Sequence, residues 1–555
     1  MRSKRNPSSW LEAAKPGARA FERAAADPRG AQVAILDAIL RRCSSTAFGK
    51  KFGFDKMKTP EDYRVGVPVM NYDALEPWIA EIADGSADIL FPGVPICLEP
   101  TSGTSSRAKL IPFTENLQNE FSAAVAPWLY AMAKEFPSIS KGTAYWSLSP
   151  AGTSDRRVSR GGVPICFPND SEYLENGLGR ALSAGFAVPP SVGQLNDTEL
   201  WRLATAAFLL KDKRLSLVSV WNPSFLSVLF DFISGNLPRL LDCLRRGTFG
   251  KMGRGNRAVE REIAAAFGAP DPGRADELKR IFSAADGAFP SAAIWPKLKI
   301  LSCWAHAAAE PEARRLAETV APAKLIPKGL LATEGVVSIP LDSETYPVLA
   351  VNSHFYEFIP ELEPDRTVFA WELEAGGRYR VVLTTGGGLY RYDLSDMVEV
   401  RGFFGKLPTL EFVGRIGNVS DFHGEKLSEE QVESALKKLF NGAIPEFALM
   451  APDGNAPPKR YILFVAGAPA EFSSAEEEES ARGLLDETLR KANFHYDHCR
   501  RLGQLEKADV VRMGHTPVEC HRRFAETVAA KRGIRMGDVK PAFLTTERID
   551  FDERV

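Results

Sequence analysis

The spacing of apolar residues predicts a chain in which helices and strands alternate over most of its length. Residues 18–42 repeat apolar positions every three to four residues, a period typical of amphipathic helices. Pro28 and Gly30 interrupt this pattern, so we expect two or more N-terminal helices. A long helix is predicted after Thr114, because threonine is a good N-cap and the run "ENLQNEFSAAVAPWLYAMAKEF" follows it.

Short apolar runs predict the strands. "GVPICLEP" and "AKLIPF" flank a polar loop, "LSLVSV" precedes a helix that begins near Pro223, and "LKILSCW" is a buried strand. "AKLIPKGLLATEGVVSIPL" favours strand–turn–strand after the helix "PEARRLAETV". From 346 to 416 β-type runs dominate, including "TVFAWEL", "RYRVVLTT" and "LEFVGR", and glycines and prolines separate them.

The pattern changes after about residue 416. A charged helix "SEEQVESALKKLF", a strand "RYILFVAG" and one helix over 474–503 indicate a small α/β module. We therefore predict a large N-terminal α/β domain over 1–416 and a small, mobile α/β domain over 417–555. The joint would be the segment 414–418.

Composition and charge narrow the function classes. The 555 residues carry a net charge of −2, so no basic field favours nucleic acid or an anionic membrane surface. No apolar stretch approaches the ~18 residues that a membrane-spanning helix needs. The seven cysteines form no CxxC pair, which disfavours zinc and disulfide frameworks and favours buried thiols in a cytoplasmic protein.

The loop in "LEPTSGTSSRAKLIPF" (98–113) concentrates hydroxyl and cationic donors between two predicted strands. Hydroxyls and backbone N–H groups in a glycine-containing turn suit phosphate oxygens, and Arg107 or Lys109 would add positive charge. The pattern GxxxxGK[ST] is absent from the chain. A polar hairpin tip is the alternative interpretation, so the loop alone is suggestive only.

Four further charged positions strengthen the phosphate hypothesis. Glu334 in "KGLLATEG" follows an apolar run, and a divalent cation is one partner for a buried carboxylate. Asp393 or Asp396 in "GGGLYRYDLSDMVEV" could accept from ribose hydroxyls. Arg415 ends a strand at the joint, and Lys540 lies in a late turn, "GIRMGDVKPAFL". Each has a simpler interpretation, as a strand-end glutamate, a turn aspartate or a solvated cation.

The set and order of these segments resemble the adenylate-forming superfamily of acyl-CoA synthetases, adenylation domains and luciferases. Over nearly the whole chain, "VGVPVMNYDALEPWI", "VSVWNPSFLSVLFDFI" and "TTGGGLYRYDLSDMV" are similar to the auxin-responsive acyl acid amido synthetases, and we expect a bacterial member. The resemblance implies the adenylate-forming fold, with β-sheets flanked by helices and a β-barrel-like part in the large domain. It also implies use of ATP and Mg²⁺.

The resemblance assigns roles residue by residue. Glu334 would hold Mg²⁺, Asp396 the ribose, with Arg415 beside it, and Lys540 would reach the acyl phosphate. Nucleotide-binding positions would be Thr101, Ser102, Gly103, Thr104, Ser105, Lys109, Ala332, Thr333, Glu334, Asp396 and Arg415. Two departures stand out: Ser106–Arg107 replaces a glycine of the phosphate loop, and Ser395 replaces the glycine that often precedes the aspartate.

The expected reaction joins a carboxylic acid to an amine through an acyl-adenylate, and the expected amine is an amino acid. An acyl-CoA ligase with a thiol acceptor and a non-catalytic nucleotide-binding relative are the alternatives. Expected contacts to the acid are Trp221 (beside Asn222), Trp304 and Phe355, whose rings favour an aromatic or alicyclic acid, although each could equally belong to the core. No base for the amine step is evident, and His354 and His423 are the histidines to test.

Overall fold

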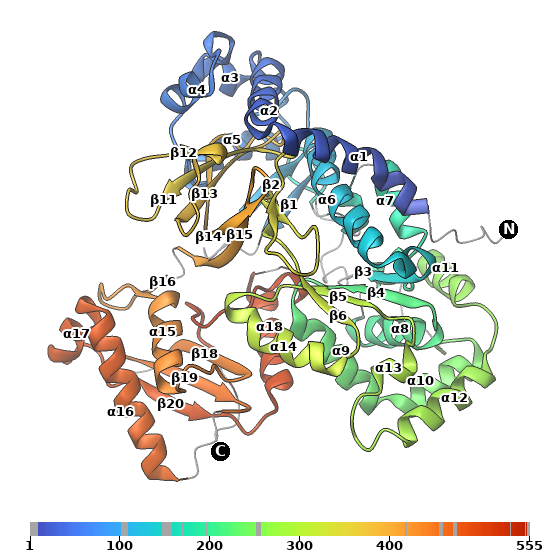
Figure 1. The fold of residues 1–555 in the computed structure, drawn as a ribbon. Coiled ribbons are helices and arrows are strands. Elements are labelled where there is room, and N and C mark those ends of the chain that lie inside the picture. The colour runs from blue at the N-terminus through green and yellow to red at the C-terminus, as the bar shows by residue number, and fades with distance from the viewer. Residues whose placement is uncertain are drawn as a thin grey trace.

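A computed structural model gives the fold (Figure 1). It describes residues 9–101, 109–146, 158–165, 167, 170–174, 176–195, 197–250, 257–416, 419–453, 459–469, 474–532, 534, 536–549 and 551.

A parallel sheet and a curled antiparallel sheet organise the structure before residue 417. The parallel sheet has the order β3-β4-β5-β6 (Thr143–Trp146, Leu215–Ser219, Ile300–Cys303, Lys324–Pro327). The antiparallel sheet has the order β12-β11-β13-β14-β15-β10-β9 (Val368–Phe369, Phe355–Pro360, Arg378–Thr384, Tyr392–Phe404, Leu407–Arg415, Val348–Leu349, Ser338–Ile339). The carboxyl ends of parallel strands are the usual place for ligands in such sheets, so their loops mark where to look for a site.

Helices cover these sheets, and several begin where the sequence predicts. Thr114 caps α6 (Glu115–Glu135) by accepting from the Leu117 N–H, and α9 (Pro223–Gly235) starts at its proline. The N-terminal helices divide at Asp27, the N-cap of the second. The other helices of this part are α1 (Ser9–Ala26), α2 (Pro28–Cys43), α3 (Ala47–Phe52), α4 (Pro60–Gly66), α5 (Tyr72–Ala83), α7 (Asn176–Ser183), α8 (Thr198–Lys211), α10 (Leu237–Arg246), α11 (Arg257–Phe267), α12 (Pro272–Ser283), α13 (Ser291–Ile294) and α14 (Glu310–Thr319).

Two hairpins carry candidate site residues. β1 (Cys97–Thr101) pairs antiparallel with β2 (Lys109–Phe113), so the polar loop joins two strands as expected. β7 (Leu331–Ala332) pairs with β8 (Gly335–Val336), and Thr333 and Glu334 form the two-residue turn between them.

The described residues from 419 onward form a C-terminal unit with its own sheet. β18 (Phe447–Asp453) pairs antiparallel with β19 (Arg460–Ala466), which pairs parallel with β20 (Asp509–Arg512). Around it lie β16 (Val419–Ser420), β17 (Leu427–Ser428), α15 (Glu429–Leu439), α16 (Ala475–Ala492), α17 (Phe494–Arg501) and α18 (Pro517–Arg532). In Figure 1 this orange-red unit lies below the antiparallel sheet, with α18 beside α9 and α14.

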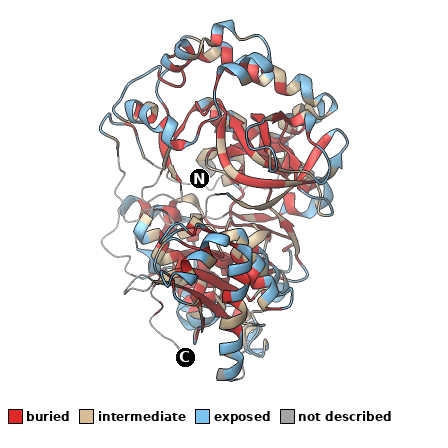
Figure 2. Cartoon of the chain, turned by 90° about the vertical axis from the view of Figure 1, so that its left-hand side faces the viewer, coloured by how far each residue is buried: buried red, intermediate tan, exposed pale blue. Residues whose placement is uncertain are grey.

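Burial follows the layers. Figure 2 shows the buried residues concentrated in the strands and on the inner faces of the helices. Separate apolar clusters fill the parallel-sheet region, the antiparallel-sheet region and the C-terminal unit. The six cysteines in the described ranges are all buried, as the sequence predicts. Within the same ranges, no helix combines the length and apolarity needed to cross a bilayer.

Two sequence predictions of secondary structure are wrong. The run "TVFAWEL" forms only a two-residue strand, because the Glu372 carboxylate accepts from the Phe369 N–H and turns Ala370–Glu372 into a 3₁₀ helix. The segment 474–503 is two helices, because the Asn493 side chain caps α17 by accepting from the Tyr496 N–H.

Candidate active site

A cavity of about 280 Å³ lies where the parallel and antiparallel sheets meet the C-terminal unit. Trp304 and its neighbours contribute from the loop after β5, and Lys328 to Leu331 contribute from the end of β6 onward. Asp396 and Arg415 contribute from the antiparallel sheet, and Lys540 contributes from the C-terminal segment. Four of the residues singled out in the sequence, Trp304, Asp396, Arg415 and Lys540, therefore share one cavity, although 236 residues (540 − 304) separate the first from the last.

Asp396 and Arg415 face each other across neighbouring strands. They are register partners of β14 and β15, and Arg415 Nε lies 3.6 Å from Asp396 Oδ1. Asp396 is 1% exposed, and its Oδ1 has no hydrogen-bond partner among the described residues. Burial alone would lower the pKa of Arg415, but the Asp396 and Glu334 carboxylates raise it. A buried carboxylate oxygen without a donor fits an incoming hydroxyl.

Ser395 makes the turn before Asp396 without glycine. Its φ of +61° lies in the left-handed region, which costs a non-glycine residue free energy. The Asp393 carboxylate stabilises this turn, because its Oδ1 accepts from the Ser395 N–H at 2.7 Å and its Oδ2 lies 3.2 Å from Arg380 Nε. Asp393 thus supports the backbone that presents Asp396.

Glu334 sits at the tip of the β7–β8 hairpin and is 5% exposed. Burial lowers the pKa of Lys109 and Lys540 and the Glu334 carboxylate opposes this shift, while Asp396 and Glu334 together raise the pKa of Arg415, so the charge of Glu334 reaches all three residues. Thr333, the other turn residue, and Ala332 before it are partly buried. The hairpin thus brings one carboxylate among three cations.

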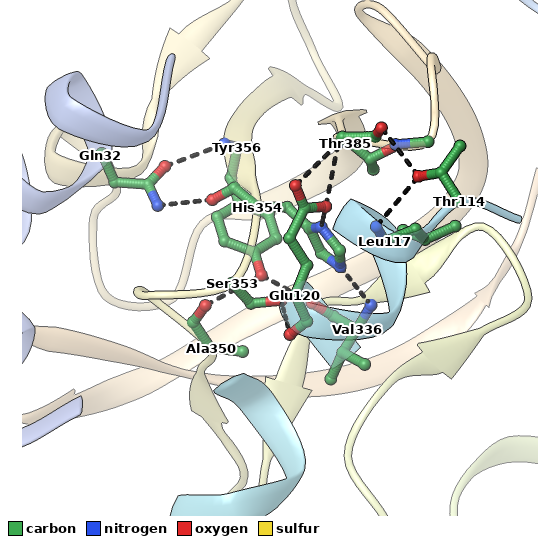
Figure 3. A network of polar contacts seen from close by, with 12 residues as sticks. Gln32, Thr114, Leu117, Glu120, Val336, Ala350, Ser353, His354, Tyr356 and Thr385 are labelled. Carbon is green, nitrogen blue, oxygen red and sulfur yellow. Dashed lines mark hydrogen bonds and ion pairs between the residues drawn. The ribbon is translucent and has the colours of Figure 1, made fainter. Parts of the chain in front are cut away.

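A buried network fixes this hairpin (Figure 3). His354 is fully buried; its Nε2 accepts from the Val336 N–H at 3.0 Å, and its Nδ1 lies 2.8 Å from Glu120 Oε2. Because Nε2 accepts, the ring proton lies on Nδ1 and is donated to Glu120. Glu120 also accepts from the Gly386 N–H at 2.8 and 2.9 Å, which joins the hairpin to the loop that leads into β14.

This network decides between the histidines. Both ring nitrogens of His354 are engaged in the core, so His354 orients the hairpin and is not placed to take a proton from an amine. His423 is exposed, and its backbone N–H donates to Glu425. The histidine that lines the cavity is His306, which the sequence did not single out. Burial lowers the pKa of His306, while Glu411 and Glu310 oppose this shift.

The polar loop is described at its two ends. Thr101 is buried and pairs with Lys109 across the hairpin. Burial lowers the pKa of Lys109, and the nearby Arg415 charge lowers it further. The ammonium group also lies 5.4 Å from the centroid of the Tyr72 ring. Ser102, Gly103, Thr104 and Ser105 lie outside the described residues.

Lys540 lines the cavity from the C-terminal segment and is partly buried. Burial lowers its pKa; Asp396 opposes this, Arg415 adds to it and Glu334 opposes it. These couplings bring Lys540 within electrostatic reach of all three residues. In this arrangement the late lysine faces the residues that the sequence assigned to nucleotide binding.

The three aromatic residues proposed for the acid separate in the structure. Trp304 lines the cavity, and its ring lies 6.0 Å from that of Trp221 at the end of the neighbouring strand. Phe355 is 0% exposed and packs against Tyr63 and Phe369 in the core of the antiparallel-sheet region. The structure therefore does not bring Phe355 to the cavity.

Sequence reasoning missed the role of Lys328 at the carboxyl end of β6. Its Nζ donates to Ser219 Oγ at 2.6 Å and lies 4.6, 5.2 and 5.0 Å from the ring centroids of Trp128, Trp146 and Trp221. Cation–π contacts of this kind stabilise a buried ammonium group. The available signal was a lysine directly after a buried strand.

Comparison with known proteins identifies similar chains. Models of the GH3 family match as its N-terminal domain over residues 17–323, its central domain over 347–415 and its C-terminal domain over 429–549. Indole-3-acetic acid-amido synthetase GH3.3 of Arabidopsis thaliana is 24% identical over 431 residues, 73% of this chain and 70% of that protein. Jasmonoyl-L-amino acid synthetase GH3.5 of Oryza sativa subsp. japonica is 25% identical over 483 residues, 80% of this chain and 81% of that protein.

A solved structure agrees in fold. "AtGH3.15 acyl acid amido synthetase in complex with 2,4-DB" superposes with a TM-score of 0.81 at 18% identity, covering 99% of this chain and 96% of the other. The mixed α/β architecture predicted for an adenylate-forming enzyme, with its curled antiparallel sheet, is thus confirmed.

Proposed function

Because the chain belongs to the GH3 family, we propose that it is an ATP-dependent acyl acid amido synthetase. It activates a carboxylic acid as an acyl-adenylate, releases pyrophosphate and transfers the acyl group to an amine. We propose an amino acid as the amine, because the relatives are named as amido synthetases and amino acid synthetases. The observation that carries this proposal is the meeting of Asp396, Arg415 and Lys540 on one cavity, within electrostatic reach of Glu334.

The first step is an in-line attack of the substrate carboxylate on the α-phosphate of ATP. Two anions must approach, so placement and positive charge matter more than covalent chemistry. Lys540 stabilises the charge that builds on the α-phosphate and the carboxylate, and Asp396 accepts from the ribose hydroxyls. Lys109 and the hydroxyls of Thr101, Ser102, Thr104 and Ser105, with the Gly103 backbone, bind the remaining phosphates.

Glu334 is the residue that would hold Mg²⁺. The described residues contain no cluster of three or more His, Cys, Asp or Glu that could hold a metal ion. This fits a magnesium ion that is held by one or two carboxylates together with substrate phosphates. The buried, single carboxylate at the hairpin tip suits that arrangement. When bound, the ion would neutralise phosphate charge during the transfer.

The second step is attack of the amine on the acyl-adenylate, with AMP as the leaving group. For this step the C-terminal unit would rotate about the segment 414–418 and carry Lys540 away from the cavity. The large domain over 1–416, the small mobile domain over 417–555, the cytoplasmic location and the bacterial source stay predictions.

The acid is proposed to be aromatic or alicyclic. Trp304, Leu330 and Leu331 give the cavity an apolar wall beside its charged groups. Relatives are named for indole-3-acetic acid and jasmonate, and the solved structure contains 2,4-DB.

ATP–pyrophosphate exchange tests the proposal with an acid panel of benzoate, cinnamate, indole-3-acetate, cyclohexanecarboxylate and hexanoate. Acid-dependent exchange by the wild type, lost in Lys540→Ala, is expected. With an active acid, a mixture of amino acids should give an amide, and coenzyme A should give no thioester. Thioester formation would make the chain an acyl-CoA ligase, and ATP binding without exchange for any acid would make it a non-catalytic relative.

A further inference from the structure

One side chain of the large domain reaches the turn that carries Lys540. Asn222 precedes α9 and is 6% exposed. Its Oδ1 accepts from the Ser224 N–H at 3.0 Å and from the Ser224 hydroxyl at 2.8 Å, which caps the helix. Its Nδ2 donates to the Val539 carbonyl at 3.0 Å, and the next residue is Lys540.

The chemistry of this contact requires an amide. The helix N-terminus needs an acceptor, and serine, threonine, aspartate or asparagine can supply one. The Val539 carbonyl needs a donor, which an aspartate in the same position lacks at neutral pH. Among the N-cap side chains of similar shape, asparagine alone serves both ends of this contact.

Ion pairs also join the large domain to the C-terminal unit, and they lie farther from the catalytic turn in sequence. Arg202 pairs with Glu526 at 3.0 Å, and Arg315 lies 3.5 Å from Glu446. Their side chains are partly exposed, and solvent-screened pairs of this kind contribute little. The Asn222–Val539 bond is buried, and Val539 is the residue before Lys540. This bond therefore fixes the position of the lysine, in addition to joining the two units.

We propose that Asn222 is a positioning residue that holds the Lys540 turn in the adenylating arrangement. The inference rests on the proposed function for its kinetic consequence. The bond joins an N-cap of the large domain to a carbonyl of the C-terminal unit, so it exists in this arrangement and breaks when the unit rotates. Losing the bond should slow adenylation and leave amide formation from a ready-made acyl-adenylate nearly unchanged.

The test compares Asn222→Asp with Ser224→Ala. Asn222→Asp keeps the helix cap but removes the donor to Val539, whereas Ser224→Ala weakens the cap and leaves that donor in place. The acid used is the one that supports the fastest pyrophosphate exchange by the wild type. With it, Asn222→Asp should lower the exchange rate about tenfold, which corresponds to losing one buried hydrogen bond and placing two acceptors against each other. Its amide formation from synthetic acyl-adenylate should stay within about twofold of wild type. Ser224→Ala should match wild type in both reactions.

A substrate-free measurement separates this inference from the proposed function. Spin labels at Glu262→Cys and Lys491→Cys, both exposed positions on the two units, report the interdomain distance by double electron–electron resonance. Asn222→Asp should broaden or shift the distribution, and Ser224→Ala should not. If wild type shows no exchange with any acid, the function fails while this arm still decides the role of Asn222. Equal loss of both half-reactions, or an unchanged distance distribution in Asn222→Asp, overturns the inference.

Discussion

Exchanging His354 for asparagine or glutamine tests whether the buried network places Glu334. The two amides divide the histidine's contacts. Asparagine matches the Nδ1 side of the ring and can still donate to Glu120, but its amide is too short to accept from the Val336 N–H. Glutamine reaches the Nε2 position and can accept from Val336, but it gives up the bond to Glu120.

The magnitude follows from burial. His354 and Val336 are both fully buried, so in His354→Asn the Val336 N–H is left without an acceptor. An unsatisfied buried donor costs about 1–3 kcal/mol, which the hairpin can relieve by shifting its turn and moving Glu334. In His354→Gln that donor stays satisfied, and Glu120 still accepts from the Gly386 N–H. We therefore expect KM for MgATP to rise roughly 5- to 100-fold in His354→Asn and only a few-fold in His354→Gln.

The assay is pyrophosphate exchange with MgATP and the acid varied separately, accompanied by thermal unfolding of each variant. KM for the acid should rise less than KM for MgATP, because the shift acts on the turn that carries Glu334, whereas Leu331 is the one residue of the apolar wall that pairs with Val336. Hydrogen exchange at the Val336 amide should be faster in His354→Asn than in His354→Gln. Equal kinetic defects in the two variants, or a fall in stability with unchanged KM for MgATP, would refute the reasoning.

Three further predictions follow from the site. Lys540→Ala should lower acid-dependent exchange about 10²–10³-fold, while ATP binding measured by calorimetry persists. Because the pKa of Lys540 is lowered below 10.5, the lysine loses its charge as pH rises through that lowered value, and wild-type exchange should fall there. Lys540→Arg keeps its charge, so its exchange should not fall in that pH range. Asp396→Asn should remove discrimination between ATP and 2′-deoxy-ATP in exchange kinetics; retained discrimination would assign the ribose to another residue. Ser395→Gly should raise the free energy of unfolding by up to about 1 kcal/mol in urea, since φ of +61° costs serine that much; a destabilised variant would contradict the strain.

The sequence predicts those elements whose signals are local. Thr114 and Pro223 mark helix starts with caps that lie beside the helices they open. The turn at Thr333–Glu334 is evident because apolar runs flank it on both sides. The break at Asn493 is an exception, because an asparagine inside a charged helical run does not by itself indicate that its side chain caps a new helix.

The supporting contacts of the site could not be predicted, because their partners are distant in the chain. Glu120 precedes His354 by 234 residues, and Asn222 precedes Val539 by 317. Asn222 lies in a segment that carries the family resemblance, but nothing local to that segment points to Val539, and Glu120 lies in none of the segments that carry the resemblance; each completes a hydrogen bond of another segment's backbone. Phe355 shows the converse problem: an aromatic residue beside recognisable motifs is indistinguishable by type from one that fills the core.

The charges of the site explain why its own residues were easier to find than their supports. Lys109, Arg415 and Lys540 come from three separate segments, and Arg415 lowers the pKa of both lysines. Burying these cations works against folding: burial keeps the pKa of both lysines lowered, although Glu334 opposes this shift for both and Asp396 opposes it for Lys540. A polyanion such as ATP would offset the unfavourable burial of these cations. We therefore expect part of the binding free energy of ATP to come from this gathering of positive charge. Charged residues that bind a ligand are recognisable in a sequence, because they lie next to apolar runs where folding alone would not favour them. Residues that only complete a neighbour's hydrogen bond carry no such signal.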